Sequence, residues 1–340
     1  MADSPVRCTI DLDGSGKQFG YLEVPRSSNT SGWSHLHVPI VAVAGGDGPT
    51  ALVVGGVHGD EPEGQVAALR LARETGPADV PGRLIVLPCA SPEASKAFTR
   101  LWPSGANLNR SFPGSPDGPP DAQLADFISR ALIARADLVV DLHSGGRSAI
   151  CPPWSEMHPV DDPEQRRRMV EGMLAWNTDF HFVYVDVAGS GLLVGEAERQ
   201  GKVVVSTELG GGGQVTAATH RIAHAGLLNV LRWFGVLHGE AVTRTQLGLG
   251  PPTIARATED DCYHFAPESG LWETLVDVTE RVERGQPLGR LHFVERPDRD
   301  PVVVASKRAG VVCSVRAIAT TEQGDSVAVV GREVEVADLL

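Results

Sequence analysis

The sequence predicts an α/β protein in which helices flank a mixed, mainly parallel sheet, followed by a smaller β-rich region. Two observations predict this class. From residue 51 to residue 237, short runs rich in β-branched residues alternate with longer stretches of helical period. Beyond residue 247 the helical period disappears, and Gly, Pro and Asp separate brief strands. The 340 residues are enough for both parts, which we predict to be residues 1–246 and 247–340.

The first part contains five apolar runs short enough to be strands. They are ALVVGGV at 51–57, LIVLP at 84–88, LVVDL at 138–142, HFVYVDV at 181–187 and KVVVST at 202–207. Two stretches have a helical period, at 121–135 and at about 216–237. The segment LGLGPPT at 247–253 is the predicted linker to the second part.

The overall charge excludes some classes of partner. The net charge is -13 and the isoelectric point is near 5.3, whereas nucleic-acid binding requires a basic surface. No basic run is present that would bind anionic lipid. The acidic surface is consistent either with attraction of a cationic substrate or with ordinary solvation, and the charge alone does not choose between them.

The cysteines and the N-terminal residues bear on location. Five scattered cysteines without a C-x-x-C spacing are typical of free thiols in a reducing compartment. The first residues lack a cationic segment followed by an apolar run, and no stretch reaches the roughly 18 apolar residues of a membrane span. We therefore expect a cytoplasmic protein without membrane association.

The segment GGVHGDEPEG at 55–64 is the first that contains candidate metal-binding residues. It follows a predicted strand and opens a helix, so its side chains are expected at the carboxyl edge of the sheet, where open α/β folds place their sites. His58 and Glu61 stand three residues apart, and a loop imidazole and a carboxylate in the first helical turn can converge on one ion. A plain turn with a carboxylate at a helix start would show the same pattern.

A third metal ligand is predicted at the end of another strand. His143 in DLHSGG follows LVVDL and occupies the same topological position as His58. Together with Glu61, the two histidines form a His₂Glu set that suits one Zn²⁺ ion per subunit. Asp141, two residues earlier, either orients a ligand or caps the strand, and the sequence does not decide which.

Three protein ligands leave one coordination position for water, which is typical of a catalytic zinc site. Such a site requires a general base. Glu208 ends the strand KVVVST and precedes four glycines in TELGGGG, so a substrate can approach this carboxylate closely. The pattern therefore predicts a hydrolase with Glu208 as its base.

The loop NLNRSFPG at 107–114 is the predicted substrate-binding segment. The planar guanidinium of Arg110 suits a carboxylate, and Asn109 adds a further donor. Arg100, ten residues earlier, is a candidate for stabilising the oxyanion of a tetrahedral intermediate. This last assignment depends only on proximity in sequence.

These four segments together resemble the succinylglutamate desuccinylase/aspartoacylase family, a branch of the zinc carboxypeptidase-like hydrolases, over nearly the whole chain. The family pattern H-x-x-E, N-R, D-x-H and a late Glu matches His58 with Glu61, Asn109 with Arg110, His143, and Glu208. The chain departs from the family pattern at Arg100, which stands two residues farther from the N-R pair than the family spacing. Residues 270–291 resemble part of the small barrel-sandwich domain of this family.

The resemblance implies hydrolysis of the amide of an N-acyl amino acid, with a small-molecule substrate and a homo-oligomer as the family-level expectation. The residues of these four motifs are most similar to those of the branch that deacetylates N-α-acetyl-L-2,4-diaminobutyrate in ectoine degradation. Alternatives are a desuccinylase or aspartoacylase, a metallocarboxypeptidase, and a non-catalytic metal-dependent binder. A substrate ammonium would need an acidic partner, for which Asp60, Glu63 and Asp117 are candidates.

Overall fold

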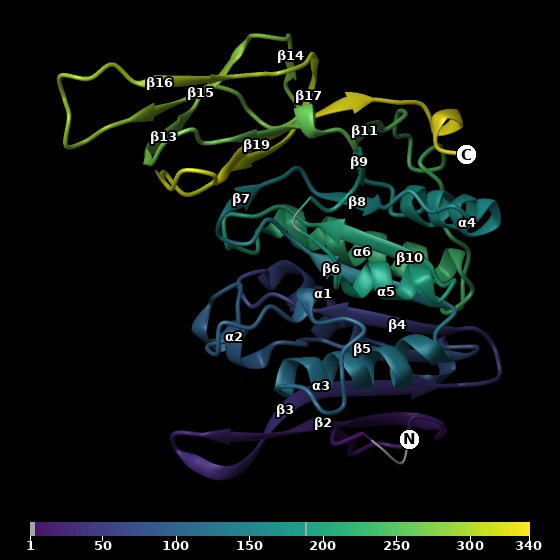
Figure 1. Ribbon diagram of the computed structural model, residues 1–340. Helices are drawn as coiled ribbons and strands as arrows, with labels where there is room; N and C mark the ends of the chain where they lie inside the picture. The colour runs from purple at the N-terminus through teal and green to yellow at the C-terminus, as the bar shows by residue number, and fades with distance from the viewer. Residues whose placement is uncertain (1–3, 188) are drawn as a thin grey trace.

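The main feature of the structure, a computed structural model that describes residues 4–187 and 189–340, is one long mixed sheet (Figure 1). The sheet runs from the N-terminal strands at one end of the molecule to C-terminal strands at the other. In spatial order its strands are β1 (Arg7–Cys8), β2 (Gly16–Ser28), β3 (Ser31–Ala44), β5 (Arg83–Leu87), β4 (Thr50–Gly55), β6 (Leu138–His143), β10 (Val203–Glu208), β8 (Trp154–Met157), β9 (Phe180–Tyr184), β11 (Thr253–Ala257), β19 (Ser326–Glu333), β17 (Gly310–Arg316) and β14 (Arg281–Val282).

The centre of the sheet has the predicted parallel arrangement. Strands β5, β4, β6 and β10 run parallel to one another, and all five predicted strands are present as β4, β5, β6, β9 and β10. Strand β8 pairs antiparallel with β10, while β9 and β11 run parallel to β8. Because β4, β6 and β10 are parallel, the residues that end them lie at one edge of the sheet.

Helices cover both faces of this sheet. The α-helices are α1 (Pro62–Glu74), α2 (Pro92–Ala97), α3 (Pro120–Phe127), α4 (Pro163–Leu174), α5 (Leu193–Arg199) and α6 (Ala217–Trp233). Helix α6 contacts both α1 and α4. Helix α1 packs on β4 and β6, and α4 packs on β10 and β8. The short 3₁₀ helices are η1 (Pro77–Asp79), η2 (Leu108–Arg110), η4 (Ile133–Arg135), η5 (Asp260–Cys262) and η6 (Val336–Asp338), and η3 (Ile128–Leu132) is a π-helix.

Both predicted helices are present, but the α-helical part of each is shorter than predicted. The stretch predicted at 121–135 is α3 followed by η3 and η4. The other is α6, which starts where the Thr216 hydroxyl accepts a hydrogen bond from the Thr219 amide at 3.0 Å and ends at Trp233.

The C-terminal residues are β-rich, as predicted, and they contribute to two sheets. Strands β11, β19, β17 and β14 extend the long sheet, with β12 (Tyr263–Phe265) pairing with β19 and β7 (Ala149–Ile150) with β17. A separate antiparallel sheet contains β16 (Val302–Ala305), β15 (Pro287–His292), β13 (Gly270–Thr274) and β18 (Thr320–Thr321). In Figure 1 this small sheet lies at the end of the molecule opposite the N-terminal strands.

The N-terminal hairpin of β2 and β3 was not anticipated from the sequence. Pro39 lies inside β3 opposite Tyr21 of β2, at a position where β5 does not pair with β3. A proline is tolerated there because one side of the strand lacks a partner in the ladder. All five cysteines are unpaired, in agreement with the prediction. Among the described residues, no helix is both long enough and apolar enough to cross a membrane.

Candidate active site

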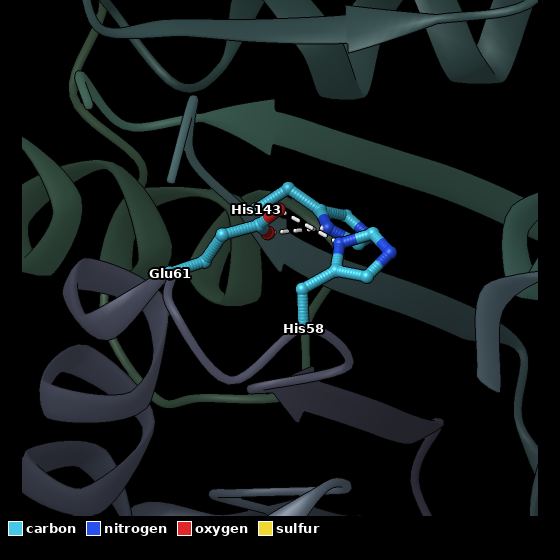
Figure 2. Close-up of side chains that lie close together, drawn as sticks. All are labelled: His58, Glu61 and His143. Atoms are coloured by element: carbon cyan, nitrogen blue, oxygen red, sulfur yellow. Dashed lines mark hydrogen bonds and ion pairs between the residues drawn. The ribbon is translucent and has the colours of Figure 1, made fainter. Parts of the chain in front are cut away.

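The three predicted metal ligands meet at the carboxyl edge of β4 and β6. His58 lies in the loop after β4, Glu61 is the N-cap residue of α1, and His143 is the last residue of β6. The position of Glu61 differs from the predicted first helical turn, because Pro62 takes the first helical position. From this cap position the Glu61 carboxylate points toward His143, the last residue of β6 (Figure 2).

The side chains of these residues converge on one point (Figure 2). Nδ1 of His58 lies 2.7 Å from Oε1 of Glu61, and Nδ1 of His143 lies 2.8 Å from Oε2 of the same carboxylate. All three side chains are buried, and one donor atom from each lies within 4.8 Å of the others. The opposite ring nitrogen of His143, Nε2, lies 2.9 Å from Oδ2 of Asp141. Asp141 therefore orients a ligand ring, which decides between the two roles left open by the sequence.

The chemistry of this donor set fits a divalent metal ion. Burial lowers the pKa of His58, which favours the neutral imidazole that binds metals. His143 is also buried, yet Asp141 and Glu61 raise its pKa well above the usual value. Two carboxylates thus favour positive charge at His143. A metal ion held by His58, Glu61 and His143 would supply that charge, and Asp141 would accept the proton of His143 Nε2. The buried triad is consistent with a bound metal.

Glu208 ends β10 directly beside this cluster. In the parallel register, Glu208 of β10 is paired with His143 of β6, so both side chains project to the same face of the sheet. Its Oε2 atom is buried and has no hydrogen-bond partner among the described residues. Burial raises the pKa of Glu208 well above the usual value, and the nearby carboxylates Glu156 and Glu61 act in the same direction.

The two predicted substrate-binding residues, Asn109 and Arg110, and the oxyanion candidate Arg100 also line the site. Arg100 reaches the cluster, with Nη1 at 3.1 Å from Oε1 of Glu61. The Asn109 side chain accepts a hydrogen bond from the Leu193 amide at 2.8 Å. Arg110 forms an ion pair of 3.0 Å with Asp186. The structure thus places all seven predicted site residues around one cavity.

This cavity has a volume of about 300 Å³ and includes residues that the sequence did not single out. Trp154, Glu156, Phe182 and Tyr184 form part of its wall. The alternation in HFVYVDV could have placed Phe182 and Tyr184 on one face of a strand, whereas β8, with only four residues, gave no clear signal. The C-terminal residues Tyr263, Ser314 and Val329 close another side. The candidates for binding a substrate ammonium, Asp60, Glu63 and Asp117, do not line the cavity.

The fold and the site together define a metallohydrolase of the α/β class. The pattern of the succinylglutamate desuccinylase/aspartoacylase catalytic domain matches residues 47–234. The chain therefore belongs to this family and is an N-acyl amino acid deacylase with a His-Glu-His metal site.

Relatives match the chain over nearly its full length. The N-alpha-acetyl-L-2,4-diaminobutyric acid deacetylase of Halomonas elongata is 37% identical over 333 residues, which cover 98% of this chain and 96% of that protein. The product-bound structure of the ectoine utilization protein EutE (DoeB) from Ruegeria pomeroyi is 38% identical, with a TM-score of 0.92 and coverage of 97% and 99%. A succinylglutamate desuccinylase/aspartoacylase from Rhodobacter sphaeroides is also 38% identical, with a TM-score of 0.92 and coverage of 98% and 100%.

Proposed function

We propose that this chain hydrolyses N-α-acetyl-L-2,4-diaminobutyrate to acetate and L-2,4-diaminobutyrate, with one zinc ion at His58, Glu61 and His143. The observation that carries the proposal is the buried triad beside Glu208 in one cavity, where Oε2 of Glu208 has no hydrogen-bond partner in the described part of the chain. The names and the 37–38% identity of the Halomonas and Ruegeria relatives support the substrate and a place in ectoine breakdown.

Three residues of the cavity act in this reaction besides the metal ligands: Glu208, Arg110 and Arg100. A zinc ion, when bound, polarises the acyl carbonyl and a water molecule. Glu208 accepts a proton from that water and returns it to the nitrogen of the leaving amine, for which its raised pKa is suited. Arg110 binds the α-carboxylate of the substrate, and Arg100 stabilises negative charge on the acyl oxygen.

The charges in the cavity favour an acetyl group over an acidic acyl group. The arginines that line the cavity are Arg100 and Arg110, and each is already paired with a carboxylate, Glu61 and Asp186 respectively. A succinyl group, or the side-chain carboxylate of acetylaspartate, requires a further cationic partner. Among the described residues that line the cavity, no lysine and no third arginine supplies one.

The direct test uses purified protein with and without zinc. Release of free amine is measured from N-α-acetyl-2,4-diaminobutyrate, N-acetylaspartate and N-succinylglutamate. We expect turnover of the first substrate, loss of turnover after chelation and recovery when zinc is restored. Preferred turnover of either acidic substrate would contradict the proposal, and a tripeptide library tests for carboxypeptidase activity in the same assay.

A further inference from the structure

One buried carboxylate of the cavity has no role in the mechanism above. Glu156 lies on β8, is 4% exposed and lines the cavity. Its Oε2 accepts a hydrogen bond from the indole nitrogen of Trp154 at 2.7 Å, and its Oε1 accepts one from the Ser206 hydroxyl at 3.2 Å. Both donors are neutral. Within residues 4–187 and 189–340, no lysine, arginine or histidine forms an ion pair with Glu156.

A carboxylate held in this way lacks a countercharge in direct contact. Burial without a cationic partner is unfavourable for the charged form, and burial raises the pKa of Glu156. The other acidic residue of this wall, Asp186, already pairs with Arg110. Among the cavity carboxylates outside the metal ligands and the proposed base Glu208, Glu156 is therefore the one that would gain most from a cation brought in by a ligand.

The surroundings of Glu156 suit an alkylammonium group. Trp154, Phe182 and Tyr184 line the same cavity, and the rings of Trp154 and Phe182 lie 4.7 Å apart. The rings of Phe182 and Tyr184 are stacked, with centroids 5.5 Å apart. A carboxylate next to aromatic faces binds a primary ammonium by charge and by cation–π attraction, whereas a substrate carboxylate would be repelled.

Strand register fixes where this group lies relative to the reaction centre. Glu156 is paired with Ser206, and the next pair along the same face is Trp154 with Glu208. Glu156 thus lies on the strand next to β10, opposite the residue two before Glu208, and both carboxylates line the same cavity. A diamino acid with its acyl group at the metal can extend its side chain toward Glu156.

We infer that Glu156, with the aromatic wall of Trp154, Phe182 and Tyr184, binds the side-chain ammonium of the substrate and restricts the enzyme to N-α-acyl diamino acids. This inference rests on the proposed function, and it assigns the selectivity to a residue outside the metal and base machinery. The expected substrates carry a short side chain that ends in a primary amine.

The test compares three substrates whose side chains share two methylene groups and end in an ammonium, a methyl or a carboxylate: the N-α-acetyl derivatives of 2,4-diaminobutyrate, norvaline and glutamate. For Glu156→Gln we expect kcat/KM to fall about 100-fold for the ammonium substrate, as when one partner of a buried charge pair is removed. The value for the norvaline derivative should stay within about threefold of the wild type, since that substrate never used the carboxylate. Activity on norvaline also shows that the variant is folded and holds its metal.

Glu198→Gln is the matched control, because it removes the same charge from a residue that pairs with His158 and does not line the cavity. We expect this control to keep the wild-type preference for the ammonium substrate. If Glu156→Gln lowers kcat/KM for all three substrates by the same factor, the inference is wrong and Glu156 has a structural role.

A binding measurement separates this inference from the proposed function. If the wild type hydrolyses none of the three substrates, the proposed function fails, and calorimetry with 2,4-diaminobutyrate and norvaline then decides the inference. Tighter binding of the diamino acid that is lost in Glu156→Gln supports the ammonium site. Equal affinity of the wild type for both ligands overturns it.

Discussion

Glu208 is the residue whose role has the clearest test. It lies beside the metal ligands without being part of the triad, and its buried oxygen has no partner among the described residues. Glu208→Gln should therefore keep its zinc content while turnover falls about 100- to 10,000-fold, the range for loss of a general base. Metal analysis and amine release measure the two quantities. Turnover at the wild-type rate would show that another group activates the water.

His181 gives a prediction for the dependence of stability on pH. The ring is fully buried, with Nδ1 at 2.8 Å from the Ser155 hydroxyl, and burial together with Arg244 lowers its pKa to about 3. In the unfolded chain the pKa is about 6.5. Below that pH the unfolded state binds a proton that the folded state excludes down to about pH 3, so stability is lost as the pH falls.

Urea unfolding tests this linkage. The free energy of unfolding should decrease more steeply between about pH 7 and pH 5 in the wild type than in His181→Gln, which cannot titrate in this range. Both proteins retain the metal ligands, so the titration of those ligands contributes equally to the two slopes of unfolding free energy against pH and does not affect their difference. Identical slopes would mean that His181 takes up a proton in the folded state.

The sequence could predict the metal ligands but not the residue at position 156. His58, Glu61 and His143 stand at strand ends and helix starts, where parallel topology brings them together. Glu156 carries no such signal, because its position in the cavity depends on the antiparallel pairing of β8 with β10. That pairing joins segments about fifty residues apart, and local patterns do not determine it.

At the level of elements, the contact between α1 and β6 holds two ligands in place. Gly64 of α1 allows this approach, because a Cβ there would lie 2.5 Å from the carbonyl oxygen of Leu142, next to His143. Gly64→Ala should lower the free energy of unfolding by about 1–3 kcal/mol through overpacking and should weaken zinc binding. Thermal unfolding and metal titration measure the two effects.

Gly195 in α5 provides the control for this substitution. The nearest atom to a Cβ at this position is 3.8 Å away, which is an ordinary contact. Gly195→Ala should therefore leave stability unchanged or raise it by up to about 1 kcal/mol, as expected for alanine in a helix. A Gly64→Ala protein as stable as Gly195→Ala would show that α1 can shift away from β6 without cost.

The elements themselves were predicted unevenly, for a physical reason. The strands β4, β6 and β10 are buried between helices and have continuous apolar runs that the sequence displays directly. The hairpin of β2 and β3 has exposed aromatic residues and internal prolines, and its Trp33 is 98% exposed. Its pairing is visible only in three dimensions.

At the scale of the whole molecule, the strand order concerns the predicted division of the chain into residues 1–246 and residues 247–340. Strand β11 pairs with β9 along its full length, and Tyr263, Ser314 and Val329 form one wall of the cavity. A chain truncated after residue 246 would expose the edge of β9 and open the site to solvent. We expect it to aggregate and to lack activity. A monodisperse, active fragment on size-exclusion chromatography would show that residues 1–246 fold independently.

The paired rows of side chains across β6, β10, β8 and β9 have a consequence for divergence among relatives. One row contains His143, Glu208 and Trp154, and the adjacent row contains Asp141, Ser206, Glu156 and Phe182. With the inferred role of Glu156, substitutions at 156 and 182 would change which side chain the cavity accepts, while His143 and Glu208 keep their places on β6 and β10. New substrates would then arise by single substitutions, with the hydrolytic chemistry inherited intact.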